Sequence, residues 1–149
     1  MNYIDSEHLA DWVSSGRASV APVDVCAAFH DELTKFPWLP TRLDWRTLPH
    51  VTLDVTKVGE ENIVDAFTQR GILLHSHLLA FFVPDQPGLV CAMEDGLKNL
   101  DYIYWKAPGV RYFCGVGPEG RGPRYGYGNF GEFDGFSRVT FRSFEEIEE

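Results

Sequence analysis

Apolar residues recur every three to four positions in several parts of the chain, which is the period of one face of an α-helix. This pattern predicts helices over residues 6–14, 22–36 and 60–70, and a capping sequence predicts a last helix over 143–149. Ser6 is a residue type that caps helix N-termini, and Gly16 is one that ends helices. Because Pro37 cannot continue a helix, the second helix must end before it.

In other segments the apolar period changes to two, which is the pattern of a strand with one buried face. The clearest case begins at Val51, where apolar residues alternate with threonine and aspartate. Further apolar and aromatic runs predict strands over residues 72–83, 89–93, 102–105, 110–116 and 136–141. The proline- and glycine-containing residues 84–88, between two of these runs, predict a hairpin turn.

The order of these elements places helices first and strands later, with one helix between them. It favours an α+β fold with a mainly antiparallel sheet, because successive parallel strands need a crossover helix. No repeat or linker interrupts the chain, so we expect residues 1–149 to form a single domain. Nine of the 14 glycines lie within residues 109–135, which are expected to form a long loop or a glycine-broken hairpin.

Composition and charge narrow the class of protein. The chain has 149 residues, of which 44% are hydrophobic and 14% aromatic, so it can bury a core. Its 22 acidic and 13 basic residues give a net charge of −9. Direct binding of nucleic acid is therefore disfavoured, because phosphates are bound mainly through Lys and Arg.

The beginning of the chain and the cysteines indicate the compartment. The N-terminus lacks the features of a targeting peptide, and the longest apolar run, residues 78–83, is too short to cross a membrane. Cys26, Cys91 and Cys114 lie far apart in apolar surroundings, as is typical of reduced, buried thiols. We expect a cytoplasmic protein with no membrane contact. The cysteine spacing indicates no zinc site, and we expect neither a metal nor a cofactor.

The histidines supply one hypothesis for catalysis. The sequence His50-Val51-Thr52 resembles half of the paired His-x-Thr/Ser signature of the 2H phosphoesterase family. In that family two such motifs provide two histidines for acid–base catalysis and two hydroxyls that hold phosphate. In this chain the later histidines form His75-Ser76-His77, with histidine where the signature requires a hydroxyl residue. This alternative hypothesis is a small hydrolase of a phosphorylated substrate, with a site made of His50, Thr52, His75 and His77.

Residues 109–135 alternate glycines with aromatic residues and arginines. They match G-x-G-x-x-G at residues 115–120, but the sequence that follows cannot form the helix that a dinucleotide site requires. Because Tyr, Phe and Arg supply many interface hot spots, we interpret the segment as a protein-binding loop. The alternative is that its aromatic residues close the open end of the sheet.

An acidic domain without an assembled catalytic motif favours a binding protein over an enzyme. The leading hypothesis is an inhibitor of the immunity or antitoxin kind found in bacterial conflict systems, which neutralises a toxin by binding it. If that toxin is a nuclease or nucleic-acid-modifying enzyme, acidic side chains would take the place of phosphates in its basic cleft. The expected contact residues are acidic or aromatic and lie near predicted turns: Glu94, Asp95, Asp101, Glu119, Tyr125, Tyr127, Phe130, Glu132 and Asp134. A scaffold domain without a discrete site is a third hypothesis.

Overall fold

The computed structural model describes residues 6–68, 75–105, 111–120 and 127–142. The strands are β1 (Ala18–Ala21), β2 (His50–Asp54), β3 (His77–Phe81), β4 (Gly88–Ala92), β5 (Arg111–Val116), β6 (Phe130–Phe133) and β7 (Arg138–Arg142). The helices are α1 (Glu7–Ser14), α2 (Val23–Leu33), α3 (Val55–Val58), α4 (Ile63–Thr68), α5 (Met93–Lys98) and α6 (Leu100–Ile103). Two 3-10 turns are η2 (Trp45–Thr47) and η3 (Glu60–Asn62). None of the helices within these ranges is long and apolar enough to span a membrane.

These elements form the predicted α+β domain. The strands make one seven-stranded sheet in the order β1-β4-β3-β5-β6-β7-β2, and every neighbouring pair is antiparallel. The first two strands of the chain therefore lie at opposite edges of the sheet. The predicted hairpin at residues 84–88 is confirmed, because it joins the paired strands β3 and β4.

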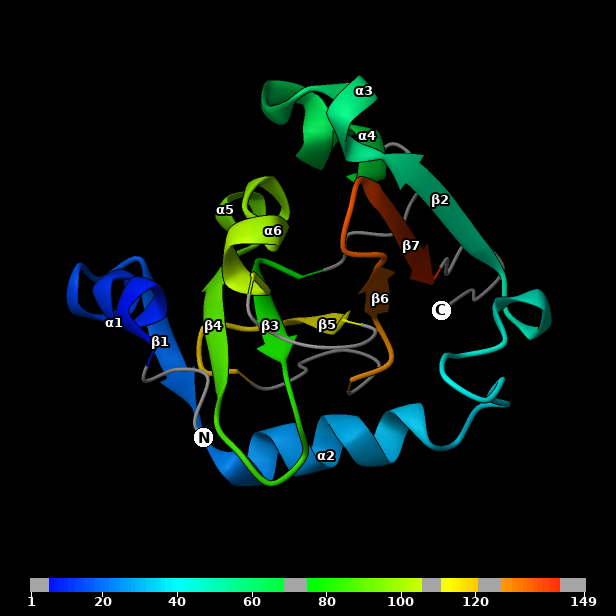
Figure 1. Cartoon of the computed structure of the whole chain (residues 1–149), viewed down its shortest axis with the longest axis horizontal. Helices are drawn as coiled ribbons and strands as arrows, with labels where there is room; N and C mark the ends of the chain where they lie inside the picture. The colour runs from blue at the N-terminus through cyan, green and yellow to red at the C-terminus, as the bar shows by residue number, and fades with distance from the viewer. Residues whose placement is uncertain (1–5, 69–74, 106–110, 121–126, 143–149) are drawn as a thin grey trace.

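Helices cover both faces of the sheet, and the period-two pattern of the strands explains why. On β3, Leu78 and Ala80 belong to the core beneath α1, α4, α5 and α6, whereas Leu79 and Phe81 belong to the core beneath α2. Figure 1 shows α2 on one side of the sheet and α3 to α6 on the other. The sheet is thus buried on both faces over its central strands.

The predicted helices largely agree with the structure. The first is confirmed as α1, and the second as α2, although α2 ends at Leu33 rather than near Phe36. The N–H groups of Lys35 and Phe36 bond to carbonyls three residues back, so the chain tightens into a 3-10 turn before Pro37. The third begins as η3 and continues as α4. The helix predicted over 143–149 lies outside the described residues.

The strand predicted over residues 102–105 is wrong, because α6 occupies this part of the chain. Leu100, Ile103 and Tyr104 are all buried, and their spacing is that of a helix face. The aromatic residues of this segment indicated a strand, but packing against the sheet overrides that preference. The Tyr104 hydroxyl donates to the Tyr112 carbonyl oxygen and accepts from the Phe81 N–H, so the buried phenol is satisfied.

The glycine-rich segment 109–135 contains a hairpin, as one of the two predictions for it states, because β5 pairs with β6. At Gly131 a Cβ atom would lie 2.8 Å from ring carbons of both Phe113 and Phe141. Glycine therefore lets these two rings approach each other across β6, with centroids 5.5 Å apart. The missing side chain serves packing at this position.

The three cysteines are free and buried, as predicted. Burial raises the pKa of the Cys26 thiol to about 11 and that of Cys91 to about 12. It also raises the pKa of Cys114, which lies in the core beneath α2. All three behave as small core residues and stay protonated near neutral pH.

Candidate functional site

The structure does not bring the candidate catalytic histidines together. His50 and His77 begin β2 and β3, and three strands lie between them in the sheet. At about 4.8 Å per strand, their backbones are roughly 19 Å apart. His77 Nδ1 lies 2.7 Å from Ser76 Oγ, and His75 Nδ1 lies 3.2 Å from Asn129 Oδ1. This separation argues against two histidines acting on one ligand.

Thr52, the hydroxyl residue of the same hypothesis, is engaged within the sheet. Its Oγ1 lies 3.0 Å from Oγ1 of Thr140, its partner in the pairing of β2 with β7. At the start of β2, His50 Nδ1 donates to the Leu48 carbonyl oxygen at 2.8 Å. Both side chains thus have local partners, and neither His75 nor His77 is among them.

Three of the predicted contact residues lie in or just before β6, an interior strand of the sheet. Phe130 and Glu132 are buried in β6, and Tyr127 is half-buried with its ring 6.4 Å from that of Phe29 in α2. Tyr125 lies outside the described residues. In this conformation a partner cannot reach Phe130 or Glu132, so their inclusion among contact residues needs correction.

Glu132 instead holds the segment of residues 34–48, here called the strap, against the sheet. Its carboxylate is 4% exposed, accepts a hydrogen bond from Trp45 Nε1 at 2.9 Å and forms an ion pair with Arg42 at 2.8 Å. Nearby, the Leu43 N–H donates to the Tyr112 hydroxyl at 2.9 Å, and burial raises the pKa of that phenol. The strap is therefore fixed by specific polar contacts on the α2 side of the sheet.

Three other predicted acids, Glu94, Asp95 and Asp101, lie together on α5 and α6. Glu94 pairs with Lys98 at 2.8 Å, and Asp95 pairs with Arg17 at 2.7 Å. Asp101 is exposed, and no ion pair joins its carboxylate to another residue within the described ranges. Its charge is therefore the least compensated of the three.

Acidic residues dominate this whole side of the molecule. The helices and the 3-10 turn over it include the acids Glu7, Asp11, Glu61, Asp65, Glu94, Asp95 and Asp101. The bases on these elements and the adjoining α3 are Lys57 and Lys98. By contrast, the strap on the opposite side holds three bases and one acid: Lys35, Arg42, Arg46 and Asp44. On that opposite side α2 is acidic as well, with Asp24, Asp31 and Glu32 and no Lys or Arg, so both helical layers carry negative charge and only the strap is basic.

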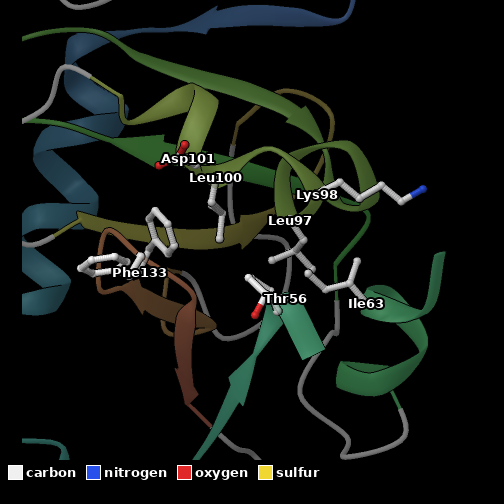
Figure 2. A pocket seen from close by; sticks show the side chains of 9 residues that line it. Thr56, Ile63, Leu97, Lys98, Leu100, Asp101 and Phe133 are labelled. Atoms are coloured by element: carbon white, nitrogen blue, oxygen red, sulfur yellow. The ribbon is translucent and has the colours of Figure 1, made fainter. Parts of the chain in front are cut away.

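A pocket of about 240 Å³ opens on the acidic side, between α3–α4 and α5–α6. Its walls are apolar and come from Val55, Ile63, Leu97, Leu100, Phe133 and Phe136. Three polar residues, Thr56, Lys98 and Asp101, complete it. Figure 2 shows Asp101 and Phe133 at one end of the pocket, and Lys98 extending away at the other end.

Phe136 at the rim of this pocket is 86% exposed. The turn that presents it is rigidly held, because Asp134 Oδ1 accepts hydrogen bonds from the N–H groups of Phe136, Ser137 and Arg138 at 2.8 to 3.0 Å. Gly135 has a φ of +88°, which other residues rarely adopt. Asp134, itself exposed, thus holds the backbone of the turn that carries Phe136.

Two more aromatic residues are exposed next to Asp101. Tyr102 stacks on Trp12 of α1 with ring centroids 5.4 Å apart, and Trp105, just after α6, is 65% exposed. We call the exposed residues Glu94, Asp101, Tyr102, Trp105 and Phe136, with the pocket, the α5–α6 surface. The sequence prediction missed all three aromatic residues of this surface. An Asp-Gly-aromatic sequence at a turn is the signal that could have found Phe136.

The remaining predicted residue, Glu119, is exposed but lies apart from the α5–α6 surface. The neighbouring Gly120 packs near Val25 and Val90, in the core beneath α2. The structure therefore gathers Glu94, Asp95 and Asp101 on one side and leaves Glu119 on the other. No protein-family model matches the chain, and neither a curated protein nor a solved structure shows significant similarity to it.

Proposed function

We propose that this protein is a binding protein of the immunity or antitoxin kind, which inhibits a basic toxin by binding it through the α5–α6 surface. One observation carries the proposal. An apolar pocket, bordered by an exposed aromatic ring and an exposed carboxylate, opens between α3–α4 and α5–α6, on a face whose helices carry several acids. Interfaces place their strongest contacts at such sites, where an anchor residue fills a pocket within a polar rim.

The exposed aromatic residues support a protein partner. Phe136 and Trp105 are large apolar side chains that face solvent, and neighbouring exposed apolar groups are typical of interaction sites. The turn around Asp134 fixes the position of Phe136 before any partner arrives. Binding then costs less conformational entropy than it would if the turn had to be ordered.

The charge distribution supports a basic partner. Opposite charge accelerates association and suppresses binding of wrong partners. A toxin that acts on nucleic acid has a basic cleft, and the acids around α5 and α6 would face it in the complex. The free, buried thiols fit action in the reducing cytoplasm, where such an inhibitor would protect the cell.

The first experiment is recovery of the partner. The tagged full-length chain is expressed in the cells that naturally produce it, and its complexes are isolated at low salt. We expect a stoichiometric basic protein that is retained by the wild type and by Glu119→Gln. Asp101→Asn combined with Phe136→Ala should lose it. Recovery of the chain alone, or equal retention by all variants, contradicts the proposal.

The second experiment separates inhibition from mere binding. The recovered partner is expressed alone and together with this chain in a cell that contains neither. We expect the partner to stop growth, the wild-type chain to restore it, and the double variant to fail. A harmless partner contradicts the toxin assignment and leaves a binding function.

A further inference from the structure

The size of the pocket indicates what kind of group it receives. Pockets for small molecules generally span about 300–1,000 Å³. The pocket between α3–α4 and α5–α6 is smaller, about 240 Å³, and it opens to the surface. A single side chain that projects from another protein suits these dimensions better than a separate ligand does.

The chemistry of the pocket narrows the choice of side chain. The walls formed by Leu97, Leu100 and Ile63 suit an alkyl stem, and the exposed ring of Phe136 offers a face for a flat cation. The Asp101 carboxylate lies at the same end as Phe133 (Figure 2). An apolar stem that ends beside aromatic rings and a carboxylate matches an arginine.

Lys98 does not oppose a cation at that end. Its Nζ lies 2.8 Å from a Glu94 carboxylate oxygen, so its charge is compensated on the helix surface. Figure 2 shows its side chain extending away from the end that holds Asp101. The Thr56 hydroxyl donates to Asp54 at 2.6 Å, which leaves its oxygen able to accept a hydrogen bond. The polar groups thus favour a donor-rich cation.

We propose that the pocket binds an arginine side chain of the basic partner, with the guanidinium paired to Asp101 and stacked on Phe136. The inference rests on the proposed function, since it names the contact by which that partner is held. Arginine fits better than lysine because its planar fork binds carboxylates with two hydrogen bonds and stacks on rings. A purely apolar side chain would cover Asp101 without satisfying its charge.

The test uses the full-length chain and a small probe, N-acetyl-arginine N-methylamide, in a titration followed by amide NMR shifts. We expect saturable shifts at Thr56, Leu97 and Asp101, with a dissociation constant in the millimolar range. The citrulline analogue has the same shape without the charge, and it should bind up to about fivefold more weakly. The lysine analogue should also bind more weakly.

Two variants make the result specific. Asp101→Asn should weaken binding of the arginine probe by up to about fivefold, whereas Glu119→Gln, which removes one exposed charge elsewhere, should leave it unchanged. Both substitutions are on the surface, and unchanged spectra away from the site verify the fold. Equal binding of arginine and citrulline, shifts outside the pocket only, or no effect of Asp101→Asn overturns the inference.

A second copy of the chain is the other occupant to exclude. Sedimentation of the protein alone should show a monomer, and concentration-dependent association abolished by Phe136→Ala would overturn the arginine assignment. Failure of this inference and failure of the proposed function are distinguishable. If the probe does not bind but the double variant still loses a basic partner, only the arginine contact is wrong. If the probe binds but no partner exists, only the proposed function is wrong.

Discussion

The strap and the α5–α6 surface use the same chemistry in opposite ways. Beneath the strap a buried carboxylate of β6, Glu132, meets an arginine and a tryptophan of the strap. On the α5–α6 surface Asp101 and Phe136 offer a carboxylate and an aromatic ring, both exposed. The comparison teaches that a carboxylate beside aromatic residues stabilises the fold when the arginine that pairs with it belongs to the same chain. Within the described residues no ion pair joins an arginine to Asp101, and under the proposed function a partner supplies that arginine.

The largest expected effect on stability comes from removing the β6 carboxylate that holds the strap. Glu132→Ala leaves the buried Trp45 N–H without its acceptor and separates Arg42 from its counter-ion. Breaking such a buried pair should lower the free energy of unfolding by about 3 kcal/mol, measured by urea denaturation. Asp101→Asn should change it by less than about 0.5 kcal/mol. Similar losses in both variants would break the comparison.

A second pair of substitutions compares tryptophans. Trp45, 6% exposed, donates to Glu132, so Trp45→Phe should destabilise the fold by about 1–2 kcal/mol. Trp105→Phe should have little effect on stability but should remove most of the fluorescence that acrylamide quenches, because Trp105 is the most exposed tryptophan described. If Trp45→Phe proves neutral, the strap is not held as the structure indicates.

The smallest expected effect is the loss of folding stability at low pH. In the strap, Arg46 donates a hydrogen bond to Asp44 and lowers the pKa of the Asp44 carboxyl. Beside the pocket, Thr56 donates to Asp54 and lowers the pKa of the Asp54 carboxyl. A carboxyl whose folded pKa is depressed stabilises the fold above its unfolded pKa and loses that contribution as pH falls through the folded value. Stability should therefore decline below about pH 4.

Both carboxyls are half-buried near the surface, where solvent still screens their charge, so each contribution to this decline is small. Urea midpoints measured between neutral pH and strong acid check it. Asp44→Asn and Asp54→Asn should each flatten the acidic limb slightly. If neither substitution changes how the urea midpoint falls in acid, other carboxyls cause the acid sensitivity.

The fold class could be predicted because periodicity reports burial, and burial decides which face of a strand or helix meets the core. The strand predicted over 102–105 is wrong because aromatic residues occur in both strands and helices. Here the packing of Leu100 and Tyr104 against the core stabilises a helix. The sequence alone also does not tell which acidic residues are buried in the fold and which lie on its surface. Glu132 and Asp134 are two residues apart, yet one is buried beneath the strap and the other forms a turn. Their roles depend on distant residues that only the folded chain brings close.

The most direct test of the central claim is hydrogen–deuterium exchange of the isolated complex compared with the free chain. The account predicts slower exchange in residues 93–105 and 134–138 on binding, with no change in the strap. Slower exchange confined to the strap or around Glu119, with α5 and α6 unaffected, would contradict it.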